Sequence, residues 1–62
     1  MDVNFAITDA PDITVFFFHY EEPQPEYELA DTAYELALAY LEEHPGRTFA
    51  DIDYDWEILP VD

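Results

Sequence analysis

Four carboxylates alternate with four large apolar residues near the end of the chain. The carboxylates are Asp51, Asp53, Asp55 and Glu57, and the apolar residues are Ile52, Tyr54, Trp56 and Ile58. Strict alternation predicts a strand with one buried face and one face that carries only carboxylates. Same-face residues on a strand lie about 6.7 Å apart, so the negative charges form a regular row. Such a row attracts metal cations or the basic side chains of another protein.

The row is costly for the chain that carries it. Neighbouring carboxylates at this spacing repel by about 0.6 kcal/mol in water and by about 2.5 kcal/mol at an effective dielectric constant of about 20. Charge alternation also occurs on amphipathic strands whose outer face is simply solvated. The composition favours a charged partner instead, because 16 Asp and Glu stand against a single basic residue, Arg47, for a net charge of -15. A surface that serves only solubility mixes both signs.

The chain has few residues that could support catalysis or metal binding. The chain has no serine, cysteine or lysine, which removes most nucleophiles of covalent catalysis, and Gly46 is its only glycine. His19 and His44 lack the spacing of metal ligands, so we expect structural roles for both. Asp51 to Asp62 matches the acidic start and the length of a calcium loop, but Trp56 occupies the sixth position, which needs glycine. The sequence therefore predicts a non-enzyme without cofactor or metal site.

The rest of the chain predicts one small domain, residues 1–62, that positions this row. Val3, Phe5 and Ile7 alternate with smaller or polar residues and predict a first strand, followed by a turn at Asp9–Asp12. Ile13–Tyr20 predicts the second strand of a hairpin. Both faces of this strand are apolar, which is typical of a central strand in a sheet.

A helix is predicted between the second and third strands. It begins between Glu26 and Thr32, either after Pro25 or at a capping box of Thr32 and Glu35, and ends near His44. Its apolar side comprises Ala30, Ala33, Tyr34, Ala37, Tyr40 and Leu41. Its opposite side carries a second acidic stripe, Glu28, Asp31, Glu35 and Glu42. The predicted fold class is α+β: a three-stranded antiparallel sheet with one helix packed on one face, in the order β-β-α-β.

One helix covers only one face of a sheet, so the second face must be covered in a different way. Either loops and aromatic side chains cover it, or it contacts a partner or a second copy of the chain through Phe16, Phe18 and Tyr20. The sequence leaves both alternatives open.

The acidic row of the third strand also matches nucleic acid in spacing, since successive phosphates along one strand lie roughly 6 to 7 Å apart. The helix stripe would be the second phosphate row. In size, charge and strand-helix layout the whole chain resembles the small acidic DNA-mimic inhibitors of phages and mobile elements, which include anti-CRISPR and anti-restriction proteins. The negative charge by itself disfavours direct binding to nucleic acid or anionic lipid, and the resemblance implies an inhibitor of another protein. It would occupy the Lys/Arg-lined groove of a nuclease, a CRISPR surveillance complex or another nucleic-acid-binding protein. The eight carboxylates of the two rows would be its contacts, with Tyr27 or Tyr54 as possible anchors.

The same charge also fits two further classes of protein. An immunity protein or antitoxin would cover the active site of a basic toxin, and a halophilic protein would use excess acid only to stay hydrated in concentrated salt. The absence of cysteine and of a signal peptide predicts a cytoplasmic protein, that is, the host cytoplasm if a phage encodes it. Val15–Phe18 is too short to span a bilayer.

Overall fold

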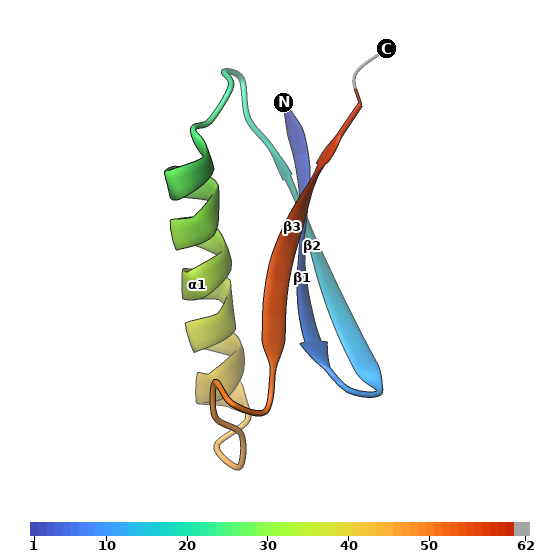
Figure 1. The fold of residues 1–62 in the computed structure, drawn as a ribbon, viewed down its shortest axis with the longest axis vertical. Helices are drawn as coiled ribbons and strands as arrows, with labels where there is room; N and C mark the ends of the chain where they lie inside the picture. Colours follow the sequence, from blue (N-terminus) through green and yellow to red (C-terminus); the bar gives the residue numbers. More distant parts are fainter. Residues whose placement is uncertain (61–62) are drawn as a thin grey trace.

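The computed structural model describes residues 1–60, which form one helix and a three-stranded sheet. The chain runs through β1 (Asp2–Asp9), β2 (Asp12–His19), α1 (Glu26–Glu43) and β3 (Asp53–Leu59) (Figure 1). Both strand pairs are antiparallel, and the strand order across the sheet is β2-β1-β3. The predicted α+β class and the β-β-α-β order are therefore confirmed.

The central strand is β1, so the prediction that the Ile13–Tyr20 segment is central was wrong. The direction of the chain supplies a physical reason. The helix returns the chain to the end of the sheet where β2 began, so β3 runs antiparallel to β1 and parallel to β2 (Figure 1). Pairing with β1 gives the slightly more stable antiparallel ladder and leaves the apolar strand β2 at an edge.

The hairpin turn fixes which side chains of β2 face the helix. Asp9 pairs with Asp12, which leaves only Ala10 and Pro11, joined by a cis peptide bond, in the turn. With this register Phe5 lies opposite Phe16, and Val3 lies opposite Phe18. Directly opposite residues share a face of the sheet. Phe16 and Phe18 therefore join the core, and the odd-numbered residues of β2 point the other way.

The core lies between α1 and the covered face of the sheet. Val3, Phe5 and Ile7 are almost completely buried, and Ala33 and Ala37 of the helix are fully buried. The two small alanines let the helix backbone approach the strands closely. The predicted apolar side of the helix was rotated by part of a turn from the observed one. Leu29, outside the predicted set, is 1% exposed, whereas Tyr34, inside it, is 45% exposed.

The helix takes the earlier of the two predicted starts. It begins at Glu26 with Pro25 as the N-cap residue. The capping box at Thr32 was wrong, because the Thr32 hydroxyl donates a hydrogen bond of 3.0 Å to the carbonyl oxygen of Glu28 inside the helix. His44 caps the other end through its backbone N–H, which donates to the carbonyl oxygen of Leu41. Within residues 1–60 no helix is long and apolar enough to cross a membrane.

Candidate functional site on the open face of the sheet

The sheet face turned away from α1 has no helix over it, and we call it the open face. Three of the four ranks of residues that cross this face from β3 through β1 to β2 follow a common pattern. They are Asp53–Thr8–Ile13, Asp55–Ala6–Val15 and Glu57–Asn4–Phe17. These three ranks have the same composition: a carboxylate on one edge strand, a short side chain in the middle and a large apolar side chain on the other edge strand. The fourth rank, Leu59–Asp2–His19 at the end of the sheet, does not share it.

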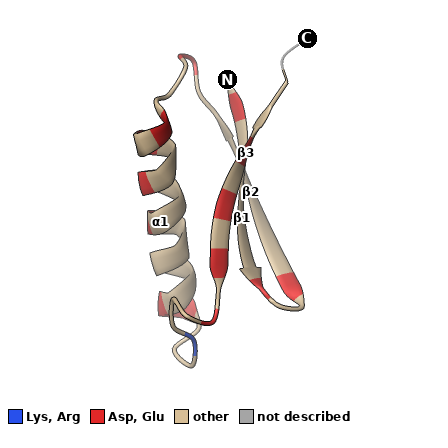
Figure 2. Ribbon diagram, in the orientation of Figure 1, with Lys and Arg blue, Asp and Glu red and all other residues tan. Residues whose placement is uncertain are grey.

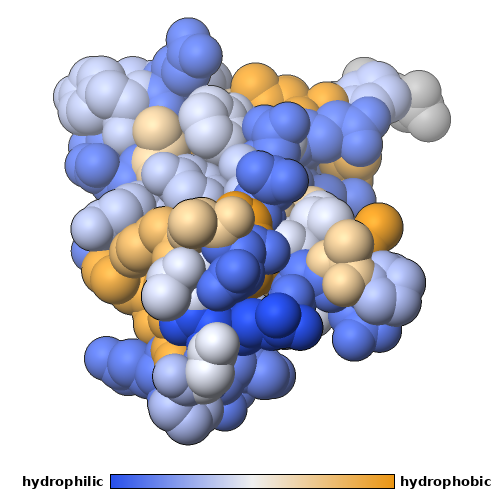
Figure 3. Space-filling model, turned by 60° about the horizontal axis from the view of Figure 1, so that its bottom comes forward, coloured by the Kyte–Doolittle hydropathy of each residue, from blue (hydrophilic) through white to orange (hydrophobic). Residues whose placement is uncertain are grey.

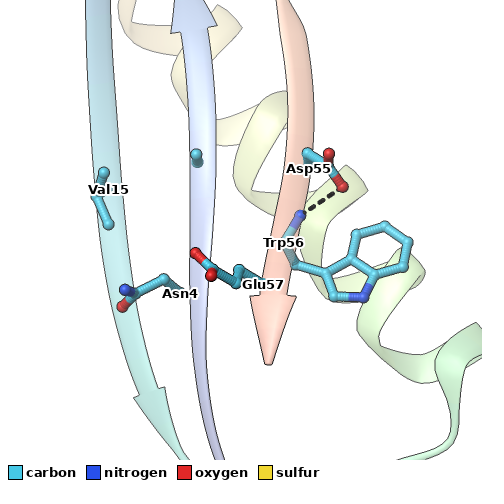
Figure 4. Close-up of a pocket in the computed structure, with 6 residues that line it drawn as sticks. Asn4, Val15, Asp55, Trp56 and Glu57 are labelled. Atoms are coloured by element: carbon cyan, nitrogen blue, oxygen red, sulfur yellow. Dashed lines mark hydrogen bonds between the residues drawn. The ribbon is translucent and has the colours of Figure 1, made fainter. Parts of the chain in front are cut away.

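The carboxylates of the three similar ranks form the acidic row, Asp53, Asp55 and Glu57. All three residues are exposed, as the alternation in the sequence predicted. Figure 2 shows these acidic positions along β3. None of the ion pairs in the described part of the chain involves the row. The Asp55 carboxylate accepts a hydrogen bond of 2.8 Å from the backbone N–H of Trp56 (Figure 4), which restrains its direction.

Asp51, the fourth residue of the predicted row, lies outside it. The strand β3 begins only at Asp53, and Asp51 belongs to the preceding turn. Its carboxylate accepts hydrogen bonds from the backbone N–H of Thr48 at 2.9 Å and from the Thr48 hydroxyl at 3.1 Å. These bonds, the backbone one first, lower the pKa of Asp51 below its usual value. Asp51 therefore stabilises a turn and adds no charge to the row.

The acidic stripe of the helix lies on the opposite side of the molecule from the acidic row. Its members, Glu28, Asp31, Glu35 and Glu42, are all exposed. Leu29, Ala33 and Ala37 point toward the sheet, so the stripe, about half a helical turn away from them, points outward. The structure thus places the two predicted rows back to back on opposite sides of the molecule.

The apolar side chains of the open face form the apolar row, Ile13, Val15 and Phe17. They are 65%, 57% and 62% exposed respectively, although they lie on a regular strand of a folded sheet. Figure 3 shows that hydrophobic atoms also reach the surface among hydrophilic ones on the side of the molecule that it views.

The residues predicted for self-association, Phe16, Phe18 and Tyr20, lie on the other face. They pack against the core, where the Phe18 ring meets Phe5 edge-on at 5.1 Å and stacks on Tyr20 at 6.1 Å between ring centroids. These residues therefore do not lie on the uncovered face of the sheet, because the register of the hairpin turns Phe16 and Phe18 toward the core. The exposed set is the alternate one, the apolar row, which the sequence pattern did not reveal.

A hollow lies between the two rows in the middle of the open face. Its volume is about 280 Å³, and it forms because the central strand carries only short side chains there. The residues that line it are Asn4, Ala6, Val15, Asp55, Trp56 and Glu57 (Figure 4). In this view the Trp56 ring points away from the side chains of Asn4 and Glu57, so the indole belongs to the covered side. The open face is therefore a shallow trough with an acidic wall and an apolar wall.

The only arginine does not neutralise this face. Arg47 Nε lies 3.2 Å from Oδ2 of Asp9, the only buried charged residue in the described part of the chain, and the Tyr40 hydroxyl donates a 2.8 Å hydrogen bond to the same oxygen. The hydrogen bond to Asp9, followed by burial, raises the pKa of Tyr40 above its usual value. The single basic side chain is thus engaged at one end of the core.

The remaining residues singled out in the sequence lie apart from the row. His19 Nδ1 is 2.6 Å from the Asp2 carboxylate at one end of the open face, and His44 stacks on the Tyr40 ring at 4.0 Å. Tyr54 alternates with the acidic row and so faces the helix side, against Tyr34. Residues 1–60 contain no group of three or more histidine or carboxylate side chains placed to hold a metal ion. Asp62, the last position of the calcium-loop pattern, lies outside the described residues.

Comparisons with models of protein families, with curated proteins and with solved structures found no match for this chain. Its function must therefore be inferred from its own residues and their geometry.

Proposed function

We propose that this chain is a non-enzymatic inhibitor whose acidic row occupies a basic nucleic-acid-binding groove of another protein in place of phosphates. The observation that carries the proposal is the regular, exposed and unpaired set of carboxylates Asp53, Asp55 and Glu57 on one side of a single strand.

The spacing of the acidic row supports the proposal. Its members alternate along β3, so neighbouring carboxylates lie about 6.7 Å apart. This is close to the roughly 6 to 7 Å between successive phosphates of one nucleic-acid strand. Because β3 is hydrogen-bonded to β1 along its length, the charges are held on a rigid frame. Lysine and arginine side chains arranged to grip a phosphate backbone would meet three charges at the expected intervals.

The charge of the whole chain supports the proposal as well. The net charge is -15, and the one arginine is paired with Asp9. A field of this strength steers a basic partner toward the protein and accelerates association at low ionic strength. It also makes the complex sensitive to salt, because ions screen exposed charges beyond a Debye length of about 10 Å at 0.1 M salt.

The contact surface that we propose is one face of the molecule. The predicted two-row arrangement required Glu28, Asp31, Glu35 and Glu42 to share the contact, but these side chains point away from the open face. A groove that receives the acidic row would leave the helix stripe in water. The stripe then contributes only to the long-range field.

A competition experiment with a matched control variant tests the proposal. Proteins retained by the immobilised chain are purified, and their complex with it is titrated with duplex DNA and with RNA. The triple variant D53N/D55N/E57Q removes three charges from the row, and E28Q/D31N/E35Q removes three charges from the helix stripe.

We expect nucleic acid to displace the wild-type chain from its partner. The row variant should lose binding, and the stripe variant should keep it. If nucleic acid does not compete, or if the row variant binds as well as wild type, the proposal is wrong. Binding to a toxin active site that does not contact nucleic acid would give the first of these outcomes and would favour an immunity protein.

A melting experiment separates the proposal from halophilic adaptation. A halophilic protein unfolds when salt is removed, whereas the inhibitor should stay folded at low salt and lose its partner at high salt. The exposed apolar row already favours the inhibitor, because large apolar side chains on the surface do not serve hydration.

A further inference from the structure

We propose that the open face binds an amphipathic basic helix of the partner, with the helix's apolar side on the apolar row and its Lys/Arg side on the acidic row. This inference rests on the proposed function, since it uses the same carboxylates, and it names the element that the partner inserts. The observation behind it is that three consecutive ranks of the open face each pair a carboxylate with an apolar side chain across a short residue.

The distance between the two rows matches the width of a helix. The acidic row lies on β3 and the apolar row on β2, with β1 between them. Neighbouring strands are about 4.8 Å apart, so the two rows are roughly 10 Å apart. An α-helix with its side chains is about 10 to 12 Å wide. One helix laid along the strands therefore touches both rows at the same time.

The hollow in the middle gives the helix a place to lie. Asn4, Ala6 and Thr8 on the central strand have short side chains, and the hollow above Asn4 and Ala6 is about 280 Å³ in volume. Each row spans five residues of its strand from first to last member, or roughly 13 Å. That length corresponds to about nine helical residues, or two and a half turns. The ranks can therefore receive successive apolar and basic residues of one helix.

The charges of the open face determine that the partner helix must be basic. Ile13, Val15 and Phe17 are each more than half exposed, and they lose contact with water only if a partner covers them. A helix that covers them also reaches Asp53, Asp55 and Glu57, and it gains from their charge only if that flank is basic. A second copy of the chain would instead bring another net charge of -15 against the first. A peptide added as a strand beside β2 would lie in the plane of the sheet and leave the apolar row uncovered.

A designed peptide serves as the probe. It has about 15 residues, with leucine along one side of the helix and arginine along the adjacent side, and its control has the same composition in an order that mixes the two. Binding is measured by titration calorimetry and by NMR chemical shifts of the wild-type chain. The tested variants are D53N/D55N/E57Q and V15T/F17S, and the control variant is E28Q/D31N/E35Q on the outer side of α1.

We expect the amphipathic peptide to bind at least about tenfold more tightly than the scrambled one, because only the ordered peptide meets both rows together. The largest shift changes should fall on Asn4, Ala6 and Val15. Each test variant should lose about tenfold or more in affinity, and the control variant should lose much less. All three variants are on exposed positions, and circular dichroism checks that they remain folded.

Three results would overturn the inference. Equal binding of the two peptides would show that only charge is recognised. Loss of binding in D53N/D55N/E57Q but not in V15T/F17S would also show that only charge is recognised. This result would leave the proposed function intact. A dimer in sedimentation experiments that F17S dissociates would show that a second copy covers the apolar row. The proposed function itself fails only in the competition with nucleic acid, so the two failures are distinguishable.

Discussion

Phe16 and Phe17 are identical neighbours in the sequence with opposite surroundings. Phe16 packs against both parts of the core under α1, whereas Phe17 is 62% exposed on the open face. The carboxylates show the same contrast. Asp9, in line with Val3, Phe5 and Ile7, is buried and holds the only arginine.

On the open face, Asp53, Asp55 and Glu57 have no basic partner in the described residues. The comparison teaches that the covered face is organised for stability. The open face instead leaves apolar side chains and carboxylates in water, which lowers stability.

The largest effect is expected on the covered face. Phe5→Ala removes a fully buried ring from beneath the helix, and such changes cost about 3 to 5 kcal/mol in free energy of unfolding. A domain of this size rarely has more than about 3 to 5 kcal/mol to lose, so the variant should be largely unfolded in buffer. Circular dichroism with urea titration measures this. A folded variant with a nearly unchanged urea midpoint would contradict the assigned core.

The second prediction separates the two phenylalanines directly. Phe16→Ala should cost about 2 kcal/mol, because the ring is partly buried against the core. Phe17→Ala should change the free energy of unfolding by no more than about 0.5 kcal/mol, as is usual for exposed positions. Both values come from urea titrations under identical conditions. Equal costs for the two variants would mean that the open face is already covered in solution.

The third prediction concerns the buried carboxylate. Arg47→Met removes the basic partner of Asp9 and leaves the carboxylate with the Tyr40 hydroxyl alone. We expect a loss of about 1 to 2 kcal/mol at neutral pH, since a buried charged acceptor loses one of its donors. The double variant D9N/R47M is the control and should recover part of the loss. No difference between the single and double variants would show that the pair is energetically unimportant.

The fourth prediction is a gain in stability, whereas the first three are losses. The variant D53N/D55N/E57Q should be more stable than wild type by about 1 kcal/mol at low salt, because two repulsions of about 0.6 kcal/mol between neighbours disappear. The gain should shrink as salt rises above about 0.1 M. Thermal melting across a salt series measures it. A variant that is less stable than wild type would show that the carboxylates make stabilising contacts.

The smallest effect concerns pH. Tyr40 has a raised pKa in the folded state, so its contribution to stability is complete below the unfolded value of about 10 and is lost as pH rises through the folded value. The stability advantage of wild type over Y40F should therefore be constant near neutral pH and decline above about pH 10. Urea titrations between neutral and alkaline pH measure the difference. An advantage that persists unchanged would contradict the hydrogen bond to Asp9.

Much of the site was readable from the sequence because it depends on local pattern. The alternation after Ile52 identified Asp53, Asp55 and Glu57 as one face of a strand, and the structure exposes all three. The predicted row wrongly included Asp51, because hydrogen bonds from Thr48 hold this residue in a turn, and an alternating sequence pattern does not reveal such bonds. The apolar row was missed, although the Ile13–Tyr20 segment was recognised as apolar on both faces.

The length of the hairpin turn determines which side chains of that segment face the core. With Asp9 paired to Asp12 the turn contains two residues, and the odd-numbered side chains of β2 must face away from Val3, Phe5 and Ile7. A turn longer or shorter by one residue would reverse the faces. The sequence placed the turn at Asp9–Asp12, and the structure confirms it, but the pairing across the turn that sets the faces of β2 was not predicted.

By itself, the sequence determined the fold class, the order of elements, the unbalanced negative charge and the alternating carboxylates. These properties depend on composition and on short-range periodicity. Only the tertiary structure decided that β1 is central, that Arg47 is paired with Asp9 and that the helix stripe lies opposite the acidic row. It also placed an apolar row beside the acidic one. The physical reason is that neighbours across a sheet are set by register and strand order, which join residues far apart in the chain.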